Sequence, residues 1–224
     1  MPTSPLFQIF ECQNADCRLR FPSNLSVDIF EKCPLCGNPV LPVGKPFNNF
    51  KRSTLIAKPS SNQIRLLLDN LRSTLNVGSI FRTANCAAID HIYCCGTSPT
   101  PAHAKFSKSG LNSEETVPWS YHRNALTIVE DLKHNGFEIY SLEVTSKSVS
   151  IFNLNTSSKS ANDVLLVVGN EISGIDPDIL DLSDSIVYIP MLGTKTSLNV
   201  SIAAAIGIYV KRFSLTELKF LAAR

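Results

Sequence analysis

IRLLLDNL, residues 64–71, is a compact apolar run, and NVGSIFRTANCAAI (76–89) and HIYCCG (91–96) follow it closely. The first and third runs are short and apolar on both faces, as buried strands are, whereas the middle run has the spacing of a helix. Strands of this kind that alternate with helices are typical of a parallel sheet covered on both sides. We therefore expect an α/β domain over residues 63–224.

The later segments continue this alternation up to residue 213. They predict strands in FEIYSLEV (137–144), VLLVVGNE (164–171) and SIVYIPML (185–192), and helices over 123–135, from 176 and over 197–213. On physical grounds alone the pattern suggests an open Rossmann-like sheet. The chain has no G-x-G-x-x-G string, which argues against ordinary dinucleotide binding.

Length and composition favour one sizeable core with a small additional domain, because 44% of the 224 residues are hydrophobic. No apolar run approaches the roughly 18 residues that a membrane span needs, and the start MPTSPLFQIF lacks a basic signal region, so we expect a soluble, cytoplasmic protein. Residues 1–62 hold 7 Lys+Arg against 4 Asp+Glu, whereas residues 63–224 hold 14 against 15. Contacts with phosphates are expected in the first part, and an ordinary solvated surface is the alternative.

Four of the seven cysteines lie in the first 36 residues, as a C-x4-C pair and a C-x2-C pair separated by fifteen residues. The second pair lies in CPLCG, where proline and glycine favour the tight turn that presents two sulfurs to one metal. We expect a zinc ribbon over residues 1–43, with structural zinc held by Cys12, Cys17, Cys33 and Cys36. A rubredoxin-like iron centre and two disulfides are the alternatives.

Residues 44–62 are polar and contain two prolines and four basic side chains, so we expect a basic linker or an arm that faces RNA. Phe47 and Phe50 in this stretch are suited to stack on bases. We favour the alternative, in which they pack against the neighbouring domain.

Three strings of the large domain carry a family resemblance: NVGSIFRTA (76–84), VGNEISG (168–174) and IPMLGTKTSLNVS (189–201). Together they resemble the signature motifs of the SpoU-type (TrmH-like) branch of the SPOUT RNA methyltransferases, over roughly residues 63–212. Members of that branch transfer a methyl group from S-adenosylmethionine to a ribose 2′-hydroxyl of tRNA or rRNA. The resemblance implies this activity and cofactor, a trefoil knot formed by the C-terminal segment, and a homodimer.

Two other functions stay open beside this one. The first is a non-catalytic RNA-binding protein that kept the fold, and the second is a SPOUT methyltransferase that acts on a base nitrogen. The complete set of motif residues argues against the first, and NVGSIFRTA favours the ribose over the base.

The resemblance also implies the residues that carry the chemistry. Arg82 matches the essential arginine of the family, either as electrostatic activator of the ribose oxygen or as the base. Asn76 either caps the helix or forms a hydrogen bond near the ribose, and Glu171 either holds the loop, orients Arg82, accepts a proton or caps a helix. Ser197 and Asn199 are the polar pair of the third motif, and either one is suited to cap the last helix.

Further residues are implied as cofactor contacts, all of them close to the ends of expected strands. The expected cofactor contacts are Thr145, Gly169, Asn170, Ile189, Met191, Gly193 and Leu198.

Within the last helix we expect the small residues Ala203 and Gly207 to meet a partner helix in the dimer. The alternative is that they pack on the helix's own sheet.

Residues 96–119 resemble a segment of one SpoU subgroup, with two departures. Gly110 stands where that subgroup has alanine, and Asn112 stands where it has glycine. We expect these departures to affect the choice of substrate more than catalysis.

Overall fold

The computed structural model describes residues 6–27, 30–48, 62–103, 106, 110, 112–154 and 162–213. The chain divides into two compact units, residues 1–57 and 58–224, and each is considered by itself. Among the described residues, no helix is both long and apolar enough to span a membrane.

The first unit is a three-stranded antiparallel sheet in the order β2-β1-β3. Its strands are β1 (Leu6–Cys12), β2 (Arg20–Asn24) and β3 (Val40–Asn48). The last strand extends beyond residue 43, where we expected the ribbon to end, because its end pairs with Leu6 and Phe7 of β1. Phe47 therefore packs on Phe7 of its own sheet, while Phe50 and most of the expected arm lie outside the described residues.

The second unit contains the predicted parallel sheet, which confirms the α/β class. Seven strands follow the order β6-β5-β4-β9-β7-β10-β8, and all neighbouring pairs are parallel. The strands are β4 (Ile64–Asp69), β5 (His91–Cys95), β6 (Trp119–His122), β7 (Glu138–Leu142), β8 (Val149–Ser150), β9 (Val164–Val168) and β10 (Ser185–Tyr188).

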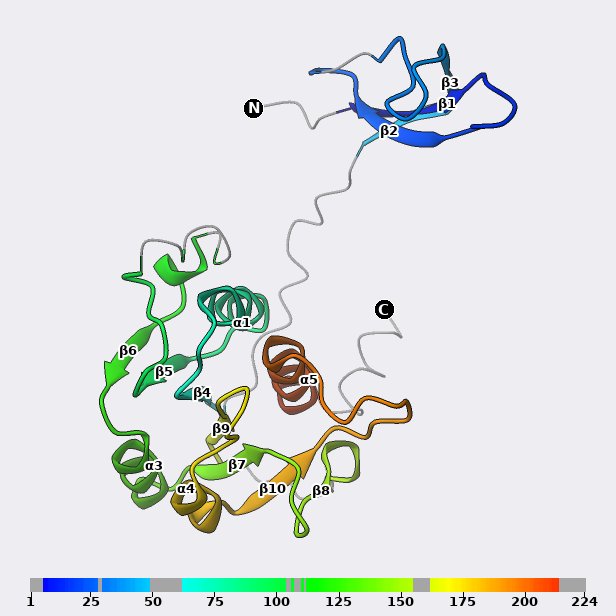
Figure 1. The fold of residues 1–224 in the computed structure, drawn as a ribbon. Coiled ribbons are helices and arrows are strands. Elements are labelled where there is room, and N and C mark those ends of the chain that lie inside the picture. The colour runs from blue at the N-terminus through cyan, green and yellow to red at the C-terminus, as the bar shows by residue number, and fades with distance from the viewer. Residues whose placement is uncertain are drawn as a thin grey trace. The chain divides into compact units, whose positions relative to one another are not determined.

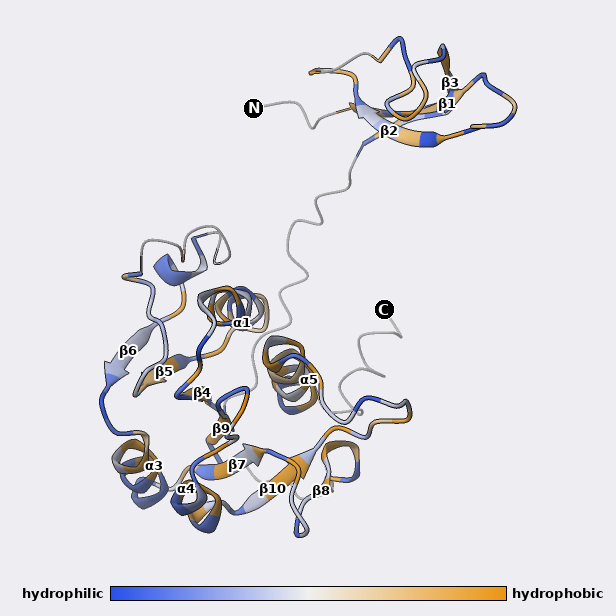
Figure 2. Cartoon of the chain, viewed as in Figure 1, coloured by the Kyte–Doolittle hydropathy of each residue, from blue (hydrophilic) through white to orange (hydrophobic). Residues whose placement is uncertain are grey.

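Helices cover both faces of this sheet, as Figure 1 shows. α1 (Thr74–Cys86) and α5 (Val200–Arg212) pack together on one face, and α3 (Ala125–His134) and α4 (Pro177–Leu182) on the other. Successive strand residues point to opposite faces, so Leu66 and Leu68 join the core under α1 and α5, whereas Leu67 joins the core under α3. The central strands are accordingly mostly apolar, and in Figure 2 the helices have a hydrophobic and a hydrophilic side. Two short 3₁₀ turns, η1 (Ser113–Glu115) and η2 (Ile151–Asn153), lie in the connections.

The small residues of α5 face the protein's own sheet, contrary to the expectation that they meet a partner helix. Gly207 is buried, and a Cβ atom there would lie 2.9 Å from Leu166 Cδ2 and 3.5 Å from Leu142 Cδ2. The missing side chain lets the helix approach the sheet closely. The outward face of α5 instead carries larger apolar residues, with Ile202 52% and Tyr209 43% exposed.

Asn112 lies in a tight turn before η1 with φ of +64°, in the left-handed region. Asparagine tolerates that conformation better than most residues with a side chain. This explains how it can stand where the subgroup has glycine.

Candidate functional site

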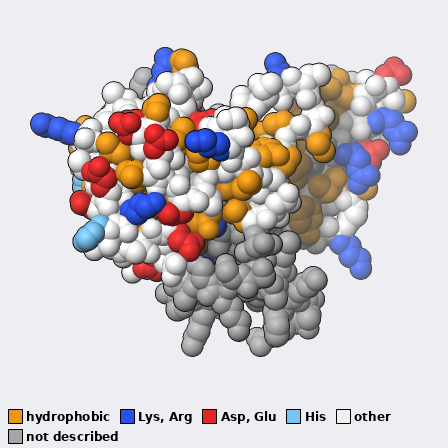
Figure 3. Space-filling view, turned by 90° about the horizontal axis from the view of Figure 1, so that it is seen from below, with side chains coloured by type: hydrophobic (Ala, Val, Ile, Leu, Met, Phe, Trp, Pro, Cys, Tyr) orange, Lys and Arg blue, Asp and Glu red, His pale blue; other side chains and the backbone are white. Residues whose placement is uncertain are grey.

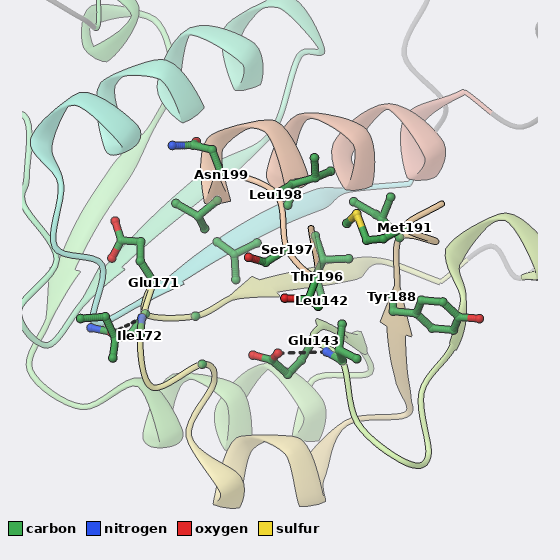
Figure 4. Close-up of a pocket in the computed structure, with 18 residues that line it drawn as sticks. Leu142, Glu143, Glu171, Ile172, Tyr188, Met191, Thr196, Ser197, Leu198 and Asn199 are labelled. Atoms are coloured by element: carbon green, nitrogen blue, oxygen red, sulfur yellow. Dashed lines mark hydrogen bonds between the residues drawn. The ribbon is translucent and has the colours of Figure 1, made fainter. Parts of the chain in front are cut away.

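A cavity of about 480 Å³ opens at the carboxyl ends of the central strands in the second unit. The strands are parallel, so the residues that follow β7, β9 and β10 meet at the same edge of the sheet. This edge is where open α/β sheets bind ligands. In Figure 4, Glu171 and Asn199 lie on one side of the cavity and Tyr188 and Met191 on the other, with Ser197 between them.

The segment after β9 forms a tight loop, and Gly169 is essential to its shape. A Cβ atom on Gly169 would lie 2.4 Å from the Gly174 carbonyl carbon and 2.5 Å from Ile175 N. Gly174 itself has φ of +76°. The backbone of Asn170 pairs with that of Gly174, which closes the loop.

Three hydrogen bonds fix this loop to the neighbouring strand ends. Asn170 Nδ2 donates to the Asn70 carbonyl at 2.6 Å, and Ile175 N donates to Glu143 Oε2 at 3.2 Å. Asp176 N donates to Asp69 Oδ2 at 3.0 Å, and Asp69 is buried. The loop is therefore held from both β4 and β7.

Glu171 reaches from this loop to the first turn of α1. Its carboxylate accepts hydrogen bonds from Arg72 N (2.9 Å), Ser73 N (3.3 Å) and Asn76 Nδ2 (2.9 Å). Partial burial acts to raise the pKa of Glu171, but these N–H donors outweigh it and lower the pKa below its ordinary value. Among the four expected roles, the geometry favours the carboxylate as the group that ties the loop to α1.

Asn76 continues this network towards the third motif. Asn199 Nδ2 donates to Asn76 Oδ1 at 3.0 Å, so Glu171, Asn76 and Asn199, one from each motif, form one chain of hydrogen bonds. Asn76 does not cap α1, because the helix begins at Thr74 and the cap is Ser73. Asn199 does cap α5, with Oδ1 accepting from Ser201 N at 2.9 Å, whereas Ser197 lies two residues earlier and lines the cavity.

Most of the expected cofactor contacts line the cavity, namely Gly169, Asn170, Ile189, Met191 and Leu198. Thr145 and Gly193 do not line it. Thr145 instead forms a small turn with Ser148, and Gly193 has no atom within 4 Å of a Cβ position.

Arg82 lies six residues beyond Asn76 on α1, exposed and outside the cavity lining. Within the described part of the chain its guanidinium forms no hydrogen bond or ion pair. The structure thus brings Asn76, Glu171, Ser197 and Asn199 together and leaves Arg82 directed to solvent.

The cavity also has lining residues that the sequence analysis did not single out, among them Leu142, Glu143 and Tyr188. Glu143 accepts hydrogen bonds from the backbone at Val144 and Ile175. The available signal was its position at the carboxyl end of an expected strand, at the same sheet edge as Glu171.

The four cysteines of the first unit form a cluster whose geometry fits one metal ion. Their sulfurs all lie within 4.8 Å of one another, with 3.4 Å between Cys12 and Cys36 and 3.8 Å between Cys17 and Cys33. Sulfurs around a tetrahedral zinc lie about 3.8 Å apart when the Zn–S bonds are near 2.3 Å. No disulfide joins them, and a single cluster of four sulfurs fits one metal ion better than two disulfides. The backbone N–H and side-chain amide of Asn38 lower the pKa of Cys36 to about 6, whereas burial raises the pKa of Cys12 to about 12, so the support for a metal site is the geometry of the four sulfurs.

Comparison with known proteins identifies relatives of the second unit. The model of the SpoU rRNA Methylase family matches residues 63–209. The 23S rRNA (guanosine(2553)-2′-O)-methyltransferase RlmP of Bacillus subtilis is 29% identical over 144 residues, which are 64% of this chain and 56% of that protein. The tRNA (guanosine(18)-2′-O)-methyltransferase of Aquifex aeolicus is 27% identical over 165 residues, 71% of this chain and 73% of that protein. The chain thus spans little more than half the length of the Bacillus relative.

A solved structure shares the fold. The TrmH/SpoU tRNA modifying enzyme of A. aeolicus superposes with a TM-score of 0.62 at 25% identity, covering 74% of this chain and 82% of that one.

Proposed function

The chain belongs to the SpoU rRNA methylase family, and from this we propose that it transfers a methyl group from S-adenosylmethionine to a ribose 2′-hydroxyl of tRNA or rRNA in the cytoplasm. The observation that carries the proposal is the chain of hydrogen bonds through Glu171, Asn76 and Asn199, which joins the three family motifs beside one cavity. These three polar side chains do not belong to the apolar core, so core packing does not account for their arrangement.

The cavity suits a nucleoside-sized cofactor. Its volume of about 480 Å³ lies within the range of small-molecule sites. Ile189, Met191 and Leu198 supply an apolar wall for an adenine ring, and the loop after Gly169 supplies backbone polar groups. When bound, S-adenosylmethionine supplies an electrophilic methyl group on a positively charged sulfur. Thr145 and Gly193 are proposed as outer contacts that act through the loops beside the cavity.

Glu171, Asn76 and Asn199 are best described as positioning residues. A carboxylate that accepts three N–H bonds and has a lowered pKa is a poor proton acceptor at neutral pH. Glu171 therefore fixes the start of α1 against the cofactor loop, and Asn199 fixes the start of α5 against α1. Ser197, which lines the cavity, is the proposed polar contact to the reacting groups.

Arg82 is the proposed electrostatic activator of the ribose oxygen. Its guanidinium is exposed and has no partner within the described chain, so it is available for an RNA phosphate or the 2′-oxygen. As a cation with several N–H donors, the guanidinium would stabilise the negative charge that develops on that oxygen.

We also propose a homodimer in which the outward face of α5 meets the partner. Ile202 and Tyr209 lie seven residues apart on the outward side of the helix. Leu198, which comes just before the helix, lies on the side of the cavity. Leu75 on α1, the helix that packs against α5, is also exposed, at 63%. Figure 3 shows another view of the molecule, in which acidic and basic side chains are interspersed with apolar ones.

For the first unit we propose structural zinc held by Cys12, Cys17, Cys33 and Cys36. The apolar core around them is small, with Phe10 and Val40 as its other buried members. A core of this size stabilises little by itself, so metal binding supplies most of the folding free energy.

The decisive experiment incubates the purified protein with total RNA and S-adenosylmethionine labelled in the methyl group, digests the RNA to nucleosides and identifies the products by mass spectrometry. We expect label in 2′-O-methylnucleosides. Label on a base nitrogen would assign the protein to another kind of SPOUT methyltransferase. Tight binding of RNA and cofactor without transfer would indicate a non-catalytic protein.

A further inference from the structure

The three-stranded sheet of the first unit has one face that its own core does not use. Along β1, Gln8, Phe10 and Cys12 are buried on the side of the cysteine cluster, whereas Phe7 and Ile9 point to the other side. The same alternation in β3 directs Leu41, Val43 and Phe47 to the outer side, in register with β1. We call this side the outer face. Leu41 and Phe47 are 54% and 43% exposed there.

Two aromatic rings form the centre of the outer face. Phe7 and Phe47 are cross-strand partners whose ring centroids lie 6.0 Å apart with an interplanar angle of 28°. Phe47 is exposed and Phe7 is partly buried, and a pair of nearly parallel rings is a surface on which planar groups stack. Nucleic-acid bases are the planar groups that proteins bind most often in this way.

A β-bulge sets the position of these rings. The register between β1 and β3 shifts after Phe7, and the buried amide of Gln8 donates to the Val43 carbonyl at 2.8 Å and to the Gly44 carbonyl at 3.3 Å. Gly44 has φ of +75°, which a glycine adopts without strain. The bulge returns Lys45 to the exposed surface between Val43 and Phe47.

The charges and edges of the sheet favour RNA over a peptide or a second copy of the chain. Lys45 has no ion pair with a described residue, so its ammonium group is free to meet a phosphate next to the rings. Glu11, the acidic residue on the outer face, is already paired with Arg20 at 3.6 Å. Both edge strands contain proline, Pro22 in β2 and Pro42 in β3, and proline opposes the pairing of an added strand.

We propose that the outer face binds single-stranded RNA, with a base stacked on Phe47 and Phe7 and a phosphate at Lys45. This inference deepens the proposed function, because it assigns to the zinc-binding unit the recognition of unpaired nucleotides in the RNA that the second unit methylates.

The test measures binding of a fluorescein-labelled single-stranded RNA of about ten nucleotides to the full-length zinc-loaded protein by fluorescence anisotropy. Phe47→Ala should weaken binding about tenfold, as expected for the loss of one stacked base, and Phe47→Tyr should retain it. Leu41→Ala is the matched control, because it shortens an equally exposed apolar side chain on the same face and should change affinity less than twofold. Lys45→Gln should weaken binding and reduce the slope of log affinity against log salt by about one.

A second readout replaces Phe47 with tryptophan, whose fluorescence should be quenched when the RNA is added. Equal RNA affinity of the wild type and Phe47→Ala overturns the proposal, as does Phe47→Trp fluorescence that does not respond. If Phe47→Ala instead changes the oligomeric state or the spacing of the two units at unchanged RNA affinity, another copy or the second unit covers this face and the proposal is wrong. Methyl transfer is measured separately. If the protein methylates RNA but Phe47→Ala does not weaken RNA binding, only this inference is wrong and the proposed function stands. If Phe47→Ala weakens RNA binding but no methyl transfer is found, only the proposed function is wrong.

Discussion

Replacing Gly169 with alanine tests the cofactor loop directly. The new methyl group would lie 2.4 Å from the Gly174 carbonyl carbon, 2.5 Å from Ile175 N and 2.6 Å from the Gly174 oxygen. Atoms in ordinary contact are about 3.5 Å apart, so the backbone must move by about 1 Å. The movement is resisted because Ile175 N is bound to Glu143 and the next backbone N–H to Asp69. Overpacking of this kind costs about 1–3 kcal/mol.

We therefore expect Gly169→Ala to lower the melting temperature by about 2–10 °C and to weaken S-adenosylmethionine binding at least about tenfold. Calorimetric titration and thermal unfolding measure the two effects. Gly193→Ala is the matched control for stability, because no atom lies within 4 Å of its Cβ position, and it should leave the melting temperature unchanged. If Gly169→Ala binds the cofactor as the wild type does, the loop does not form the binding site.

The remaining predictions concern separate parts of the molecule. Arg82→Ala should lower the single-turnover rate about 100-fold and leave cofactor affinity unchanged, and a near-normal rate would refute the assigned role. Elemental analysis should find one zinc per chain, and Cys36→Ser should reduce that content while S-adenosylmethionine binding persists; iron in its place would contradict the assignment. The depressed pKa of Glu171 contributes stability above its ordinary value of 4.5, and this contribution is lost as the pH falls through the lower folded value. Glu171→Gln should therefore lower the free energy of unfolding by about 1 kcal/mol at neutral pH, after allowance for screening. In denaturant titrations the difference in unfolding free energy between the variant and the wild type should disappear in acid rather than stay constant. Ile202→Glu should give monomers in light scattering, whereas Val149→Glu, equally exposed on β8, should leave the dimer intact.

The sequence predicted the central strands well because their apolar runs are buried on both faces. Leu66, Leu67 and Leu68 illustrate this, since all three are fully buried but pack against different helices. The outer strands β6 and β8 were missed. WSYH, the sequence of β6, alternates aromatic and polar residues over only four positions, and β8 has two residues, so both strands are too short to give a clear periodic signal.

The site was predictable where a motif named the residues and less so where tertiary contacts decide the role. Gly169 and Asn199 lie at the cavity as the family resemblance implies. The choice among the possible roles of Glu171 depended on its contacts with Arg72 and Ser73, which lie about 100 residues earlier in the chain. Spacing along a sequence contains no information on such a pair. Glu143 was missed for the same reason, since its partner Ile175 comes from a different strand end.

The last helix shows why an apolar pattern alone does not reveal which side meets a partner. SLNVSIAAAIGIYV is apolar on every side, and its small residues suggested a close helix–helix contact. Small residues are equally suited to a helix that approaches its own sheet, and Gly207 does this against Leu142 and Leu166. Ala203 on the same side lines the cavity, while the larger Ile202 and Tyr209 point away from it. One turn of α5 thus borders the cofactor cavity on one side and an exposed apolar surface on the other. A partner that packs on the outer side would limit how far the helix can move from the cavity, and dimer formation and cofactor affinity are therefore expected to change together.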